Sequence, residues 1–135
     1  MNIIFLLHPK ETVAYLNENA TVRQGLEKMR VHGYTAIPVI GKDGSYVGTI
    51  TEGDFLWHMV FTGKNDIKDL EEHHISDIMR PDFNPAVRIS ATIDDLLLRV
   101  MNQNFIPVVD DRNLFMGIIT RKDVIKYFYD KDREK

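Results

Sequence analysis

Apolar and polar positions follow one pattern that the chain contains twice. An apolar run with proline in second place occupies residues 37–40 and again residues 106–109. A second apolar run then ends in the order Gly-x-Ile-Thr-x-x-Asp, at residues 48–54 and 117–123. The two copies stay 69 residues apart from position 37 to position 54, without insertion or deletion. A repeat that keeps both its apolar pattern and its polar ends indicates a chain built from two copies of one unit.

The first copy predicts three strands and two helices. Thr21 is a favoured N-cap residue, Gly33 supplies a left-handed stop, and apolar residues at helical spacing lie between them. Pro38 lies inside an otherwise buried strand, which indicates either an edge position or an interruption of the strand ladder. The predicted elements are a short strand or extended segment at 12–16, a helix from 22 to near 33, strands at 35–40 and 46–50 around a hairpin turn at 41–44, and a helix after Thr51 that closes at 63–66.

The second copy predicts the same order of elements, and the connection at residues 64–84 contains one short helical piece around 75–79. Its elements are a strand at 87–89, a helix capped by Thr92, strands at 105–109 and 114–119 around a turn at 110–113, and a final helix from Arg121. We therefore predict an α+β fold of two β-α-β-β-α repeats. Repeat one is assigned to residues 1–63, a linker to 64–74 and repeat two to 75–135.

Composition narrows the class of protein. The 135 residues carry a net charge of −3 with both signs spread along the chain, and no basic stripe predicts nucleic-acid binding. The absence of cysteine excludes disulfides and fits a reducing cytoplasm. The apolar residues 3–7 are too short for a signal peptide or a membrane span, so we expect this segment to dock onto the domain or a partner copy.

The doubled strand, hairpin and Thr-x-x-Asp ending resemble the tandem CBS-domain pair, or Bateman module, over residues 9 to 129. The Ala-Thr-apolar starts of both first helices, at residues 20–22 and 91–93, also match, as does the Ile78-Met79 opener of copy two. The resemblance implies pseudo-two-fold symmetry, a homodimer and a non-catalytic sensor of adenosine-containing ligands such as AMP, ATP, S-adenosylmethionine or cyclic dinucleotides. Residues 33–38 and 120–121 are similar to those of small stand-alone bacterial CBS proteins that bind cyclic di-AMP.

The repeated motif has a physical rationale of its own. A threonine at a helix start lies beside free backbone N–H groups and the positive end of the helix dipole, which suits a phosphate. An aspartate three residues later can accept both hydroxyls of a ribose, whereas a phosphate would repel it. The segments at residues 34–36 and 104–105 are placed to offer adenine an apolar slot. The alternative is a capping box, in which the same two side chains tie down the helix start without any ligand.

Two binding sites follow from the resemblance, since in this family the motif of one repeat meets the leading segment of the other. Site A combines Thr120, Arg121 and Asp123 with Thr12, Ala14, Thr35 and Ala36. Site B combines Thr51 and Asp54 with Val87, Arg88 and Phe105.

The two copies differ between threonine and aspartate. Copy two has Arg121 and Lys122 there, whereas copy one has Glu52 and Gly53. A guanidinium adds a charge-assisted contact to a phosphate, and a glutamate opposes one. We therefore predict that site A binds the phosphate and that site B is weak, empty or nucleoside-like.

No other pattern predicts a different chemistry. His73 and His74 are adjacent and lack a third ligand at metal-site spacing, so neither a metal nor a cofactor is expected. No nucleophile and base can be paired, so the chain is not expected to be an enzyme. Trp57 is expected in the core or on a dimer surface. The predicted function is regulation: an adenine nucleotide binds in the inter-repeat cleft and changes the affinity for a partner protein. The alternative is a structural or interaction module whose motifs are caps only.

Overall fold

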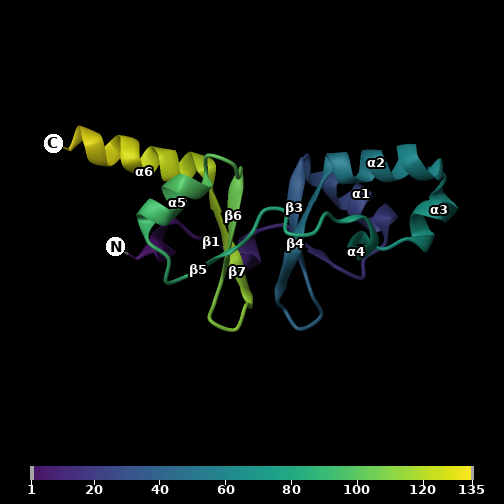
Figure 1. The fold of residues 1–135 in the computed structure, drawn as a ribbon, viewed down its shortest axis with the longest axis horizontal. Coiled ribbons are helices and arrows are strands. Elements are labelled where there is room, and N and C mark those ends of the chain that lie inside the picture. Colours follow the sequence, from purple (N-terminus) through teal and green to yellow (C-terminus); the bar gives the residue numbers. More distant parts are fainter. Residues whose placement is uncertain (1, 135) are drawn as a thin grey trace. The chain divides into compact units, whose positions relative to one another are not determined.

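The computed structural model describes residues 2–134, which form two compact units (Figure 1). The first-copy unit is Ala14–Phe83, and the second-copy unit joins the residues up to Val13 to those from Asn84 onward. The predicted α+β class and the order β-α-β-β-α are present in both units. The compact units do not coincide with the predicted repeat bounds of 1–63, 64–74 and 75–135, which remain a prediction for the sequence repeat. The N-terminal segment packs with the later copy, and residues 64–83 pack with the earlier one.

The first-copy unit contains a three-stranded sheet and four helices. The central strand β3 (Ala36–Ile40) pairs parallel with β2 (Leu16–Asn17) and antiparallel with β4 (Tyr46–Thr51). The helices are α1 (Val22–His32), α2 (Glu52–Thr62), α3 (Ile67–Glu72) and α4 (Ile75–Ile78). Residues such as Ile37, Ile50 and Phe55 form the core between sheet and helices.

The second-copy unit contains a four-stranded sheet in the order β1-β7-β6-β5. Its elements are the 3-10 helices η1 (Ile3–Leu6) and η2 (Lys10–Thr12), the strands β1 (His8–Pro9), β5 (Val87–Arg88), β6 (Phe105–Val109) and β7 (Phe115–Thr120), and the helices α5 (Ile93–Arg99) and α6 (Arg121–Arg133). Figure 1 shows α5 and α6 against this sheet. Ile3 is fully buried in the unit's core, which confirms that the N-terminal apolar segment docks on the domain.

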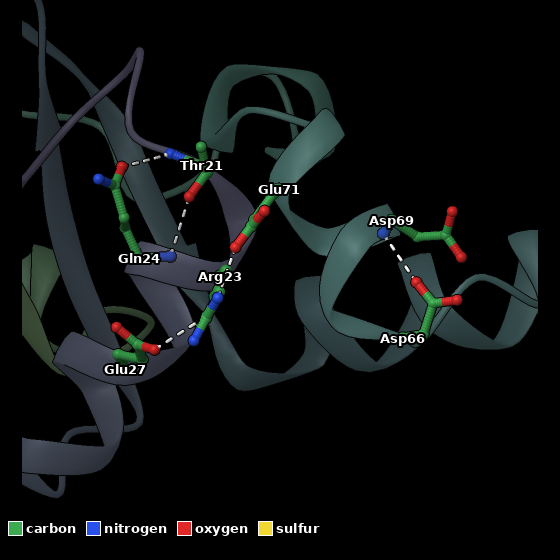
Figure 2. Close-up of polar contacts among 7 residues, drawn as sticks. All are labelled: Thr21, Arg23, Gln24, Glu27, Asp66, Asp69 and Glu71. Carbon is green, nitrogen blue, oxygen red and sulfur yellow. Dashed lines mark hydrogen bonds and ion pairs between the residues drawn. The ribbon is translucent and has the colours of Figure 1, made fainter.

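The helix starts and stops follow the sequence signals. Thr21 forms a complete capping box with Gln24, and Gly33 ends α1 in the left-handed conformation with a φ of 69°. Helix α3 was not predicted, because Asp66, which caps its start, was assigned to the end of the preceding helix. Arg23 on α1 forms ion pairs with Glu27 and with Glu71 of α3 (Figure 2).

Two expectations about strands need correction. The predicted strand at 12–16 is wrong in its first part, since Lys10–Thr12 is helical and only Leu16–Asn17 pairs. An edge position for Pro38 is also wrong, because β3 is central in its sheet. The other expectation, an interrupted ladder, is confirmed: β2 pairs with Val39 and Ile40 only, so the ladder begins after the proline that lacks an N–H.

The repeated glycine allows another segment of the chain to approach each sheet closely. A Cβ on Gly117 would overlap the carbonyl oxygen of His8, and this glycine has a φ of +151°. At the equivalent Gly48 a Cβ would overlap only the terminal methyl group of Met79, the flexible end of a side chain. The backbone of β1 therefore requires glycine at 117, whereas Met79 can shift at 48.

We predict that Gly117→Ala lowers the free energy of unfolding by about 2–4 kcal/mol, because a strained backbone and a steric overlap add together. The matched change Gly48→Ala should cost about 1 kcal/mol, since a methionine side chain can rotate away. Denaturant unfolding of both variants measures the difference. Equal losses of unfolding free energy at the two positions would show that the backbone of β1 does not require glycine at position 117.

Candidate functional site

Both Thr-x-x-Asp motifs lie at helix N-termini, as the sequence predicted. The Thr51 hydroxyl caps α2 by accepting a bond from the Asp54 N–H at 3.3 Å, and the Thr120 hydroxyl caps α6 by accepting one from the Asp123 N–H at 3.2 Å. The threonines therefore perform the capping role in both copies. What distinguishes the copies is the state of the aspartate.

In copy one both carboxylate oxygens of Asp54 are hydrogen-bonded. Its Oδ2 accepts from the Thr51 N–H at 2.8 Å and from the Thr51 hydroxyl at 3.0 Å, which completes a capping box. Its Oδ1 accepts from Nε of Arg80 at 2.9 Å. The Asp54 side chain is only 4% exposed. No oxygen of Asp54 is left for a ligand unless a buried charge first loses its partner.

In copy two the carboxylate is held more loosely. Nε2 of His8 lies 2.5 Å from Oδ2 of Asp123, whose side chain is 32% exposed. Within residues 2–134, Asp123 receives no bond from the Thr120 N–H, so α6 lacks the complete capping box of α2. The contact with His8, and secondarily the hydrogen bond with Thr120, lowers the pKa of Asp123 below its usual value. A charged and partly solvated carboxylate at a helix start remains available.

His8 and Arg80 were not predicted as site residues. Each follows a leucine or methionine and precedes a proline, in Leu7-His8-Pro9 and Met79-Arg80-Pro81. Each reaches the aspartate of the motif in its own unit. A search for the apolar-basic-Pro triplet, which recurs 72 residues apart, could have found both from sequence.

The distribution of cations differs from the expectation. Arg80 reaches Thr51 as well as Asp54, since its Nη2 lies 3.3 Å from the Thr51 hydroxyl. The idea that only copy two carries cations at its motif is therefore wrong. In copy two, the backbone N–H of Arg121 donates to the Asn104 carbonyl at 2.9 Å. In the described part of the chain, the buried Nε of Arg121 has no hydrogen-bond acceptor.

The remaining site residues are divided between the two units. Thr12, Val87, Arg88 and Phe105 lie in the second-copy unit with Thr120, Arg121 and Asp123, and Ala14, Thr35 and Ala36 lie in the first-copy unit with Thr51 and Asp54. Within its own unit, Ala36 pairs with Thr51 across β3 and β4, and Phe105 pairs with Thr120 across β6 and β7. Sites shared between repeats remain a prediction.

Two absences concern other chemistries. Among the described residues no three histidine, cysteine, aspartate or glutamate side chains are grouped to hold a metal. The ring centroids of His58 and His73 lie 4.9 Å apart in an edge-on arrangement, and burial lowers the pKa of His58. In residues 2–134 no helix has the length and apolar character that a membrane crossing requires.

Comparison with known proteins identifies the family. The model of the CBS domain matches residues 7–60 and again residues 75–130. The chain belongs to the CBS-domain family. The doubled match agrees with the two β-α-β-β-α repeats, and it confirms the resemblance that the motifs indicated.

Three CBS proteins show how far the likeness extends. A crystal structure of CbpB in complex with c-di-AMP has a TM-score of 0.88 and 25% identity, covering 100% of this chain and 91% of that one. Cyclic di-AMP receptor B of Bacillus subtilis is 26% identical over 116 residues, which is 86% of this chain and 78% of that protein. A CBS domain-containing protein of Dictyostelium discoideum is 28% identical over 121 residues, covering 82% of this chain and 80% of that protein.

CBS repeats also occur as parts of enzymes. A match with inosine-5'-monophosphate dehydrogenase of Methanocaldococcus jannaschii covers 84% of this chain but only 21% of that protein. The relatives matched over most of their own length are instead described as a receptor and as a domain-containing protein. The chain is thus similar to CBS proteins that are not described as enzymes, and to the CBS segment of one that is.

We predict that Arg80→Ala lowers the free energy of unfolding by about 1–3 kcal/mol, because Oδ1 of the buried Asp54 then lacks a donor. Arg112→Ala is the matched control: its side chain is exposed in a turn, and the change should cost no more than about 0.5 kcal/mol. Denaturant unfolding measures both. Indistinguishable midpoints would mean that Arg80 does not hold the carboxylate in solution.

Proposed function

We propose that this CBS protein is a regulatory sensor that binds an adenosine-containing nucleotide through Asp123 and the N-terminus of α6. The observation that carries the proposal is the difference between the two aspartates. Asp54 has both oxygens bonded and is buried, whereas Asp123 is partly exposed and lacks the bond from the backbone N–H of its threonine. An acceptor for ribose hydroxyls is therefore present in copy two and engaged in copy one.

Arg121 supports a phosphate in the same place. Its Nε is buried without an acceptor, and such a donor has a free-energy cost that a phosphate oxygen would remove. Lys122 lies next to it on α6, beside the positive end of the helix dipole. Of the two proposed sites, site A thus binds nucleotide, with Thr12, Ala14, Thr35 and Ala36 completing it, and site B, with Thr51, Asp54, Val87, Arg88 and Phe105, stays weak or empty.

The ligand class follows from the relatives together with this chemistry. CbpB was crystallised with c-di-AMP, and the Bacillus subtilis relative is a cyclic di-AMP receptor. We propose cyclic di-AMP, AMP or ATP as the ligand, and regulation of an effector protein as the outcome. The cysteine-free composition agrees with the predicted cytoplasmic location.

We expect calorimetry with cyclic di-AMP, AMP and ATP to detect binding of at least one of them to the wild type. Asp123→Ala should weaken that binding by about 1.5–3 kcal/mol, roughly 10- to 100-fold, because a charge-assisted acceptor is lost. Asp54→Asn is the matched control at the equivalent position and should change affinity less than about threefold.

Two results would contradict this assignment. If Asp54→Asn abolishes binding and Asp123→Ala does not, copy one contains the site. If no adenosine compound raises the thermal midpoint at 100 times a micromolar dissociation constant, the chain is an interaction module whose motifs are caps, since a ligand of the folded state must stabilise it.

We further propose that the protein is a homodimer in which α2 meets α2 of a second copy. The side chains of Leu56, Trp57, Val60 and Phe61 are all exposed on this helix, Phe61 to 81%. The Trp57 and Phe61 rings stack at 5.6 Å, and residues 55–62 contain no acidic residue, lysine or arginine. An uncharged apolar helix face is complementary to itself, as a two-fold interface requires.

We predict that Phe61→Glu raises the dimer dissociation constant by about 100-fold or more, since an aromatic anchor is lost and a charge is placed in the contact. Val31→Glu on α1, where the side chain is also largely exposed, is the control and should leave association unchanged. Sedimentation velocity over a concentration series separates the two outcomes. A monomeric wild type at high micromolar concentration would contradict the proposal.

A further inference from the structure

The carboxylate that the proposed function gives to the ligand already has a partner. Nε2 of His8 lies 2.5 Å from Oδ2 of Asp123, and the pairing of β1 with β7 fixes the histidine there. His8 pairs with Ile118 in that register, two residues before the motif threonine. The His8 carbonyl also lies close to Gly117, which brings the backbones of the two strands together at this point. Strand pairing thus places the backbone of His8 beside the motif of copy two.

Copy one shows the same device with another side chain. Arg80 holds Asp54 through Nε, reaches Thr51 through Nη2, and stacks on the Phe83 ring with 3.9 Å between the guanidinium carbon and the ring centroid. A guanidinium keeps its charge at all physiological pH values and makes several directed bonds at once. The imidazole of His8 makes one bond to the carboxylate and is 47% exposed.

We propose that His8 is a releasable latch on the Asp123 carboxylate, which must leave before a ribose can bind, and that Arg80 is the permanent counterpart that keeps Asp54 closed. This inference rests on the proposed function, because it assigns the regulation of the same site. A ribose engages a carboxylate through two hydroxyls, and the imidazole of His8 takes one acceptor position on Asp123, whose side chain is only 32% exposed. Nucleoside and histidine therefore compete for Asp123.

Competition fixes the sign of the pH dependence. Protonation gives His8 a full charge and strengthens its bond to the carboxylate, which stays ionised because its pKa is depressed. The latch therefore tightens as pH falls and histidine side chains take up protons, and nucleoside affinity falls with it. The other titratable groups described around the contact are Lys10, two residues along the chain, and Lys122, Lys126, Tyr127 and Asp130 on α6; Lys126 and Asp130 are paired with each other at 3.3 Å.

Adenosine is the probe that isolates the latch, because it has no phosphate to attract a protonated histidine. For the wild type, we expect calorimetry to show weaker adenosine binding at pH 6 than at pH 8. His8→Ala should bind adenosine about threefold to tenfold more tightly at pH 6 and remove the pH dependence, as expected for the loss of one competing hydrogen bond. His8→Arg copies the first-copy device and should bind more weakly than the wild type at both pH values. Arg112→Ala, in an exposed turn, is the control and should leave both the adenosine affinity and its pH dependence unchanged.

The outcomes against the latch are distinct. If His8→Ala binds adenosine more weakly than the wild type, His8 is a ligand contact, and if the variant keeps the pH dependence, another group is responsible. If the wild type does not bind adenosine, the latch is judged without ligand, and the proposed function fails only if AMP, ATP and cyclic di-AMP do not bind either. The nitrogen resonance of the His8 ring should then shift when Asp123→Asn removes the charged acceptor, and an unshifted resonance would overturn the latch as well.

Discussion

The unsatisfied backbone N–H groups at the starts of α2 and α6 set the constraint on which each repeat depends. A helix start has free donors and a positive dipole end, so it attracts a hydroxyl and a carboxylate to the same small volume. Thr51 and Thr120 supply the hydroxyl, and Asp54 and Asp123 the carboxylate. Each carboxylate can then accept hydrogen bonds from the backbone, from a basic side chain or from a ligand, and these three kinds of partner compete for its oxygens.

Residues outside the motif determine which partner binds each aspartate. In copy one the Thr51 N–H and Arg80 together engage both oxygens of a buried aspartate, so its release would leave an uncompensated buried charge. In copy two His8, together with a hydrogen bond from Thr120, holds a partly solvated aspartate, and water can replace the exposed histidine at small cost. Two motifs with the same spacing therefore serve different ends, one structural and the other suited to exchange.

The sequence predicts the elements well because the signals that place them are local. Threonine caps, left-handed glycines and alternating apolar runs located α1, α2, β3 and β6 without any long-range information. The errors have different causes. Helix α3 begins at a local cap, Asp66, which was assigned to the end of α2, whereas the strand predicted at 12–16 was shortened because Lys10–Thr12 turns helical beside β1. Nothing local indicates that the segment around Ile3 packs with the later copy.

The same distinction explains the candidate site. Counting charges between threonine and aspartate favoured site A, yet the cation of copy one comes from Arg80, 26 positions beyond Asp54. The proposed ranking of the two sites nevertheless remains the same, for a different physical reason: in the proposal, the number of accessible carboxylate oxygens matters more than the number of nearby cations. An additional cation strengthens a phosphate contact only if the sugar acceptor beside it is free, and Arg80 uses its charge to occupy that acceptor. A basic side chain that bonds to the motif aspartate therefore blocks that carboxylate, and its charge is not available to a ligand phosphate.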